Sequence, residues 1–359
     1  MNNTTLKTNN RIISYDVMRI FAAVAVVMIH SVAEFIKDCP VMSIDYAVMN
    51  IIDSITRFSV PLFVMISGAL ILDEEKEFSM KKMSRYVLRM LIILYAWSLL
   101  YSVILNIVLP IIHDNNISIK LFVNSFIFGN HHQWYLFMVI GLYLITPILK
   151  TFVKKSNIRA VEWFIVLSVA FQFAVPIINL AVNLLSAEEY NIVEQLVGSF
   201  KIDFVGGYTT YYILGWYLKN VDINAKKRKI IYFMSSIGLI TTILGVQFVN
   251  KSAVQAQDLF YSYLTVNVFL YSMGVFIFLD HFSKKIRNVK LISIIENLSR
   301  LTFGVYLIHV FFINCSKSII NFDNRIVSFL TMWLITTVAS FASVYIMSKI
   351  PLIKKLIKC

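Results

Sequence analysis

Three ionisable residues interrupt a strongly apolar segment near the start of the sequence. Asp16, Arg19 and His30 lie within YDVMRIFAAVAVVMIH, residues 15–30, whose other residues mostly suit a helix in lipid. Charged side chains are costly inside a bilayer, so they generally face a protein interior, a cavity or a partner. The planar fork of arginine suits phosphate, and a neutral imidazole accepts a proton from a hydroxyl. The segment therefore holds candidates for anion binding and general base catalysis.

The spacing of these residues places them on one face of a helix. Arg19 and His30 are 11 residues apart, which corresponds to a rotation of roughly 1100°, about 20° beyond three turns, and to a rise of roughly 16 Å. Asp16 precedes Arg19 by three residues and Glu34 follows His30 by four, so each is a neighbour on that face. We expect a polar face that runs from the cytoplasmic membrane edge to beyond the middle of the bilayer.

Two further apolar segments carry ionisable residues. His309 lies in LSRLTFGVYLIHVFF, at a depth similar to that of His30, and Tyr306 shares its face. Asp53 and Arg57 have an i, i+4 spacing in another segment. Each also has a purely structural interpretation, because membrane histidines hydrogen-bond neighbouring helices and ion pairs tie helices together.

Other patterns are less informative. The stretch HHQWYL at 131–136 is either part of a site or an aromatic belt at the membrane interface, and YTTYYILGWYL at 208–218 is more typical of packing. Cys39, Cys315 and Cys359 are odd in number and lack metal-binding spacing, so no role is assigned to them. No zinc motif, serine-hydrolase elbow or phosphate loop is present, and we expect no bound metal.

The composition shows which elements must hold these residues. Of the 359 residues, 58% are hydrophobic and 15% charged, and the mean hydropathy is +0.73, whereas soluble domains are about 45–50% apolar. We predict an all-α integral membrane protein with one domain, 1–359, whose polar residues 1–14 precede a retained signal anchor. Ten segments are long enough to span a bilayer, near 17–35, 48–72, 86–112, 134–153, 161–185, 203–218, 230–249, 259–280, 301–320 and 327–348.

The distribution of basic residues predicts the orientation. With ten spans and a cytoplasmic N-terminus, 25 of the 33 Lys and Arg residues fall in cytoplasmic segments and 6 on the other side. Positive segments stay in the cytoplasm, so both termini are predicted to be cytoplasmic. The formal net charge of +13 thus reflects orientation, and because it is divided among short segments no nucleic-acid partner is expected. We predict a multi-pass protein of the cell membrane.

These residues resemble the membrane-bound acyltransferase-3 family over nearly the whole chain. The most specific part is YDVMRIFAAVAVVMIH, which is similar to the family's Asp-x-x-Arg followed by ten residues and a histidine. Supporting matches, in order along the chain, are VPLFVMISGALIL at 60–72, QWYLFMVIGLYLITPIL at 133–149, YYILGWYL at 211–218 and LTFGVYLIH at 301–309.

The resemblance implies transfer of an acyl group, usually acetyl, from cytoplasmic acetyl-CoA to a hydroxyl of an extracytoplasmic sugar or glycan, with no permanently bound cofactor. It implies that His30 is the base and Arg19 an essential arginine. Arg19, at the cytoplasmic end of the polar face, is expected to hold the CoA phosphates, and its neighbour Asp16 is assigned to the same donor site. Glu34 and His309 are candidates for orienting His30 or passing on the proton.

Aromatic and charged residues provide candidates for the acceptor side. Trp134 and Tyr135 are candidates for stacking on a sugar ring, and Tyr306, on the face of His309, is a further candidate for substrate binding. Arg57, paired with Asp53, is a candidate for stabilising the oxyanion or binding an anionic acceptor.

Several alternatives stay open at this stage. A transporter or flippase of a polysaccharide precursor also needs charged residues within spans, and a non-catalytic assembly subunit tolerates the loss of Arg19 and His30. The acceptor, the length of the acyl group and the choice between direct transfer and an acyl-histidine are undetermined. So is the choice between a homo-oligomer and a separate extracytoplasmic partner.

Overall fold

The computed structural model describes residues 12–41, 43–76, 79–112, 116–186, 192–199, 206–249, 256–317, 319–320 and 322–358. All regular structure in these residues is helical, which confirms the predicted fold class. Within them, eight helical segments are long and apolar enough to cross a membrane, or nine if one bent pair is a single span. The chain is therefore a multi-pass helical membrane protein.

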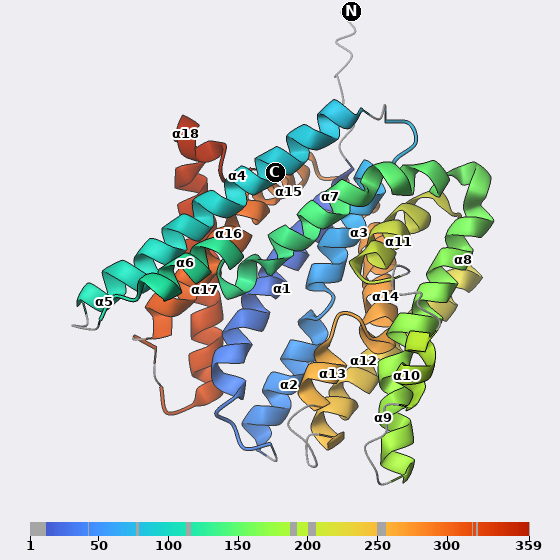
Figure 1. Cartoon of the computed structure of the whole chain (residues 1–359), viewed down its shortest axis with the longest axis horizontal. Helices are drawn as coiled ribbons and strands as arrows, with labels where there is room; N and C mark the ends of the chain where they lie inside the picture. Colours follow the sequence, from blue (N-terminus) through green and yellow to red (C-terminus); the bar gives the residue numbers. More distant parts are fainter. Residues whose placement is uncertain are drawn as a thin grey trace, which may run out of the picture.

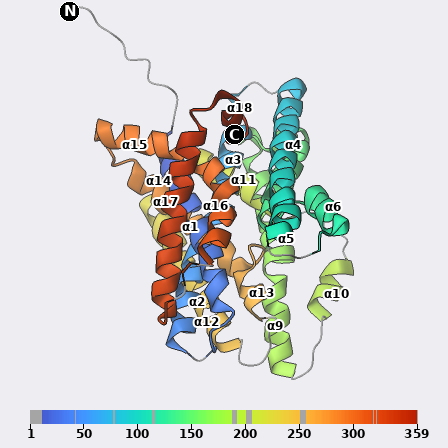
Figure 2. The same cartoon turned by 90° about the vertical axis from the view of Figure 1, so that its left-hand side faces the viewer.

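The helices follow one another with few long connections (Figures 1 and 2). The first half of the chain forms α1 (Ile13–Ile36), α2 (Ile44–Thr56), α3 (Ser59–Ile71), α4 (Met80–Val103), η1 (Ile104–Val108), α5 (Leu109–Ile112), α6 (Ile119–Phe128), η2 (His131–Gln133), α7 (Trp134–Phe152), η3 (Lys155–Asn157), α8 (Ile158–Ser168), η4 (Val169–Phe173) and α9 (Val175–Ser186). The second half forms α10 (Ile192–Ser199), α11 (Tyr208–Asn220), α12 (Ala225–Val249), α13 (Ala256–Tyr261), α14 (Val266–Ser283), α15 (Val289–Ser299), α16 (Thr302–Lys317), α17 (Arg325–Met347) and α18 (Pro351–Lys354). The elements η1 and η4 are π-helical, and η2 and η3 are 3-10 turns.

Two of the ten predicted spans are shorter than a membrane requires. The segment predicted at 203–218 corresponds to α11, which has 13 residues and a length of roughly 20 Å, while residues 200–205 lie outside the described part. The segment predicted at 301–320 corresponds to α16, which has 16 residues and reaches spanning length only together with α15, at a bend of 57°. The apolar pattern predicts both helices correctly but overestimates their lengths.

The ends of the helices are sorted by charge. The start of α4 and the helices α15 and α18 lie at one end of the bundle in both views, while α13 and the junction between α1 and α2 lie at the other (Figures 1 and 2). The first group carries Lys81, Lys82, Lys290 and Lys354, which the sequence places in cytoplasmic segments. This arrangement fits the predicted orientation, and we refer to that end as the cytoplasmic end.

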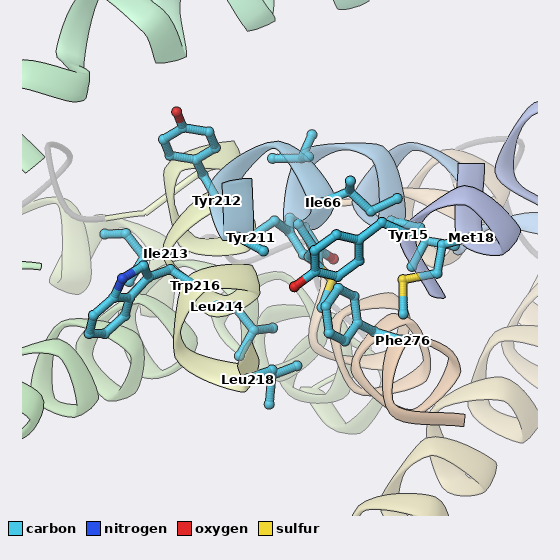
Figure 3. Close-up of a cluster of buried hydrophobic side chains, with 14 of the residues drawn as sticks. Tyr15, Met18, Ile66, Tyr211, Tyr212, Ile213, Leu214, Trp216, Leu218 and Phe276 are labelled. Carbon is cyan, nitrogen blue, oxygen red and sulfur yellow. The ribbon is translucent and has the colours of Figure 1, made fainter. Parts of the chain in front are cut away.

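Two glycines allow α3 and α11 to cross at close range. A Cβ atom on Gly68 would lie 1.7 Å from the carbonyl oxygen of Tyr212, and one on Gly215 would lie 1.9 Å from that of Met65. Small residues at such crossings let backbones approach in membranes, where apolar side chains gain little from leaving lipid. Around this crossing, side chains of α1, α3, α11 and α14 form a buried core, with Tyr211, Tyr212 and Trp216 fully buried (Figure 3).

A proline divides the second apolar segment into α2 and α3. Pro61 has no amide hydrogen for the carbonyl of residue 57, and its ring would crowd that carbonyl in a continuous helix. Helix α2 accordingly ends at Thr56, whose hydroxyl lies 3.0 Å and 2.9 Å from the carbonyl oxygens of Ile52 and Asp53. The break leaves Arg57 between the two helices, inside the bundle.

Candidate functional site

Three adjoining cavities lead from the cytoplasmic end of the bundle to His30. We call them the basic cavity, which is lined by four Lys and Arg residues, the arginine cavity, which is lined by Arg19, and the histidine cavity, which is lined by His30. Their volumes are about 460 Å³, 430 Å³ and 380 Å³, respectively. The basic and arginine cavities share Leu70, Ile71, Met90 and Tyr143 in their walls. The arginine and histidine cavities share Phe63, Tyr135 and Tyr306. Each cavity therefore adjoins the next across shared side chains.

The basic cavity is lined by four cationic side chains. Lys76, Lys82, Arg89 and Lys150 all contribute to its wall, and Lys150 Nζ also donates to the carbonyl of Asp73 at 2.8 Å. Four cations around one cavity create a strong attraction for an anionic ligand. Sequence reasoning had assigned these residues only to membrane orientation.

Arg19 lies in the arginine cavity, held by buried polar groups. Its Nη1 atom donates to Asp16 Oδ1 at 2.9 Å, and the hydroxyl of Ser299 donates to the same oxygen at 2.7 Å. Asp16 is fully buried, whereas the side chain of Arg19 is 29% exposed. Arg300 and Lys358 also line this cavity. Asp16 itself lines none of the three cavities. Its role is indirect, because its contact with Arg19 helps to position the guanidinium.

His30 lies in the histidine cavity, which His131 and His132 also line. Its ring centroid is 5.0 Å from that of His309, which in turn is 5.4 Å from that of His132. The Nδ1 atom of His309 lies 2.7 Å from the carbonyl oxygen of Tyr306. Since a carbonyl only accepts, Nδ1 carries the hydrogen and Nε2 keeps its lone pair. Helices α1 and α16 and the turn η2 supply these rings.

Aromatic side chains form the wall between the arginine and histidine cavities. The ring of Tyr135 lies 6.2 Å from that of Phe63 and 5.3 Å from that of Tyr306. The hydroxyl of Tyr306 donates to the backbone carbonyl of His132 at 2.6 Å, which fixes its ring. A ligand that extends from Arg19 to His30 has to pass these three side chains.

Arg57 and Trp134 lie in the wall of the histidine cavity. Arg57 Nη2 donates to Asp53 Oδ2 at 2.6 Å, and its guanidinium lies 4.1 Å from the ring centroid of Tyr261. Trp134 stacks on Tyr263, with ring centroids 6.2 Å apart. The cavity therefore combines a compensated arginine with an aromatic surface, an arrangement that accepts a polar ring with an apolar face.

Glu34 is placed apart from the cavity. Its carboxylate forms ion pairs with Lys37, at 3.5 Å, and with Lys317. Glu34 is not among the described residues that line the histidine cavity. The structure thus brings His309 to His30 but directs Glu34 to two lysines.

His132 is the residue of this cluster that sequence reasoning did not single out. It belongs to the turn after Gly129, whose φ is +74°, a conformation that favours glycine. Asn130 and Gln133 form a capping box, with Gln133 Oε1 accepting from the Asn130 amide at 2.6 Å. This rigid turn buries His132 and leaves His131 exposed. The adjacent histidines and the Asn-x-x-Gln pattern were the available signal.

Within the described residues, no group of three His, Cys, Asp or Glu side chains is arranged to hold a metal ion. The fold and the cavities define a polytopic membrane protein with a histidine centre that adjoins a cationic entrance. A family model described as an acyltransferase domain matches residues 12–349. The chain therefore belongs to the acyltransferase-3 family and is a membrane acyltransferase. No curated protein and no solved structure matches the chain significantly.

Proposed function

We propose that the protein transfers an acetyl group from cytoplasmic acetyl-CoA to a hydroxyl of an extracytoplasmic sugar or glycan at the cell membrane. The observation that carries this proposal is the series of three adjoining cavities, cationic at the cytoplasmic end and lined by His30 at the other. CoA has an anionic nucleotide and a long arm that ends in the thioester, so it matches this order of groups. No permanently bound cofactor is part of the proposal.

In the donor half of the site, the basic cavity binds the phosphates of CoA. Lys82 and Arg89 neutralise the nucleotide end, and Arg19 holds a further anionic or polar group of the arm. The spacing of Arg19 and His30, roughly 16 Å along α1, leaves room for the arm between them. Phe63 and Tyr135 then enclose the arm and exclude water from the thioester.

In the chemical step, His30 accepts the proton of the acceptor hydroxyl as its oxygen attacks the thioester carbonyl. The new C–O bond forms, the C–S bond breaks, and CoA leaves as the thiol, so that its sulfur gains the proton that the hydroxyl has lost. His309, with its hydrogen directed at the Tyr306 carbonyl, offers Nε2 as an acceptor that orients the His30 ring. Arg57 stabilises the negative charge on the carbonyl oxygen. Both direct transfer and an acyl-histidine are compatible with this arrangement.

On the acceptor side, Trp134 provides a surface on which a sugar ring stacks. The Asp53 carboxylate compensates the charge of Arg57, so the site has no unmatched charge that requires an anionic acceptor. A neutral sugar hydroxyl therefore suits the cavity at least as well as an anionic group.

Consumption of the thioester separates this function from its rivals. Purified wild-type protein in nanodiscs is expected to release CoA thiol from acetyl-CoA when lipid-linked or oligomeric glycans from the producing cell are added, and His30→Ala to abolish the release. His281→Ala is the control, because His281 lies at the end of α14 and lines none of the three cavities. Movement of glycan without thiol release would instead indicate a flippase.

A further inference from the structure

Three imidazoles line the histidine cavity, His30 from α1 and His131 and His132 from η2. His131 is exposed and His132 is buried, while the fully buried His309 has its ring centroid 5.0 Å from that of His30 and 5.4 Å from that of His132. In the proposed function His30 is the base, whereas His132 has no assigned role. A buried, ionisable side chain is costly in a membrane protein, and such residues generally serve the function of the cavity that they line.

The ring of His132 is buried without hydrogen-bond partners. His132 is 2% exposed, and neither Nδ1 nor Nε2 has a hydrogen-bond partner. Most buried polar atoms are hydrogen-bonded, and an orphaned one indicates a missing ligand or water. The edges of Tyr101 and Tyr306 pack on the ring with centroids 5.0 Å and 5.9 Å away. The ring is therefore held in place by aromatic contacts, and its two nitrogens are buried in the cavity wall without a side-chain partner.

Several groups surround this ring and bear on its protonation. His309 and Tyr306 face it from α16, Tyr101 from α4, and His131 precedes it in the same turn. His30 and Arg57 line the same cavity from α1 and from the α2–α3 break. These neighbours are imidazoles, tyrosines and one guanidinium, and no carboxylate is among the described residues that line this cavity.

Acyl transfer from a thioester to a hydroxyl moves one proton from oxygen to sulfur. If donor and acceptor enter from opposite ends, a single histidine would have to reach both the attacking oxygen and the departing sulfur. We propose that His132 is a second catalytic residue, which protonates the departing CoA sulfur while His30 deprotonates the acceptor. This inference rests on the proposed function of the cavity.

The step is balanced without any further reactant. The C–O bond forms and the C–S bond breaks. The hydroxyl proton passes to His30, and the His132 imidazolium gives its proton to the sulfur, so CoA leaves as the thiol. The proton on His30 returns to His132 through the cavity that they share, and the net change is ester plus thiol from alcohol plus thioester.

The test uses membrane vesicles from the producing cells, which contain the endogenous acceptor, and radiolabelled acetyl-CoA as the donor. Base-labile label in the acceptor is measured against pH and donor concentration. His132→Gln keeps a similar volume but cannot carry the proton, and we expect kcat to fall by about 100-fold with little change in KM. The alkaline limb of the pH profile, which requires a protonated acid, disappears in this variant while the acidic limb of His30 stays.

Chemical rescue separates catalysis from packing. In His132→Ala, added imidazole is expected to restore transfer at least about tenfold, since it supplies the missing acid within the vacated space. The His281→Ala control shows full activity and no rescue. Retention of activity within about threefold in His132→Gln, or a loss that imidazole does not reverse with both limbs of the pH profile retained, would overturn the proposal.

The wild-type profile gives a check that needs no variant, in case the substituted proteins do not fold. It must fall at both ends, and a profile with only a rising limb contradicts a second acid. Loss of all transfer in wild-type vesicles would count against the proposed function itself, whereas activity that depends on His30 but not on His132 would count only against this inference.

Discussion

The buried carboxylate of Asp16 contacts Arg19, and Asp16→Asn tests whether this contact positions the guanidinium. Asp16 Oδ1 accepts from Arg19 at 2.9 Å and from Ser299 at 2.7 Å. The amide of Asn keeps an acceptor oxygen but loses the charge, so we expect the contact with Arg19 to weaken by roughly 1.5 kcal/mol. If that energy holds the guanidinium in place for the donor, the affinity for acetyl-CoA falls about tenfold.

The assay is the steady-state kinetics of thiol release from acetyl-CoA. We expect KM for acetyl-CoA to rise about tenfold in Asp16→Asn, with kcat within about threefold of wild type, because in the proposed function Arg19 binds the donor and does not react. Asp280→Asn is the matched control, since it removes the partner of the exposed Lys284 at 2.6 Å, outside all three cavities, and such exposed ion pairs are worth little. An unchanged KM, or a loss confined to kcat, would refute the role assigned to Asp16 and Arg19.

Two further predictions concern stability, measured by thermal unfolding in detergent. Gly68→Ala places a Cβ 1.7 Å from a backbone oxygen and should lower the free energy of unfolding by about 2 kcal/mol or more, because α3 and α11 are forced apart. Gly141→Ala, with open space around it, should not destabilise the protein. Equal effects of the two substitutions would contradict the close crossing of α3 and α11. Burial raises the pKa of Asp73, but the hydrogen bonds from Lys219 and from the Glu75 amide, together with the charges of Lys219 and Lys76, outweigh it, and the pKa lies below its ordinary value. Asp73→Asn should therefore lower stability at neutral pH by about 1 kcal/mol. This difference should vanish as the pH falls below about 3.9 and through the lowered pKa, since only the ionised carboxylate contributes; a difference that persists in acid would count against the ion pair.

The helical fold and the polar face of α1 were predictable because they depend on local rules. Apolar runs of sufficient length specify membrane helices, and the spacing of Arg19 and His30 fixes their relative direction once the segment is helical. The break at Arg57 was also encoded locally, by Pro61. It went unpredicted because the apolar pattern alone continues across it.

The cavities were not predictable from one sequence, because their walls come from helices distant along the chain. Lys82, Arg89 and Lys150 looked like orientation signals, and only the packing of α4 against α7 and the α3–α4 connection brings them around one space. For His132, the sequence was equally compatible with a functional site and with an aromatic belt at the membrane interface. Its burial follows from the capped turn before α7, which the pattern of apolar residues does not register.

In the proposed function, the acetyl group crosses the bilayer from a cytoplasmic donor, with His30 as the base. The most direct measurement uses sealed inside-out vesicles, with radiolabelled acetyl-CoA added to the exposed cytoplasmic face. We predict base-labile label on acceptors inside the lumen for the wild-type protein, protected from an esterase added outside, and none for His30→Ala inserted at an equal level. Equal luminal label with the two proteins would contradict the account.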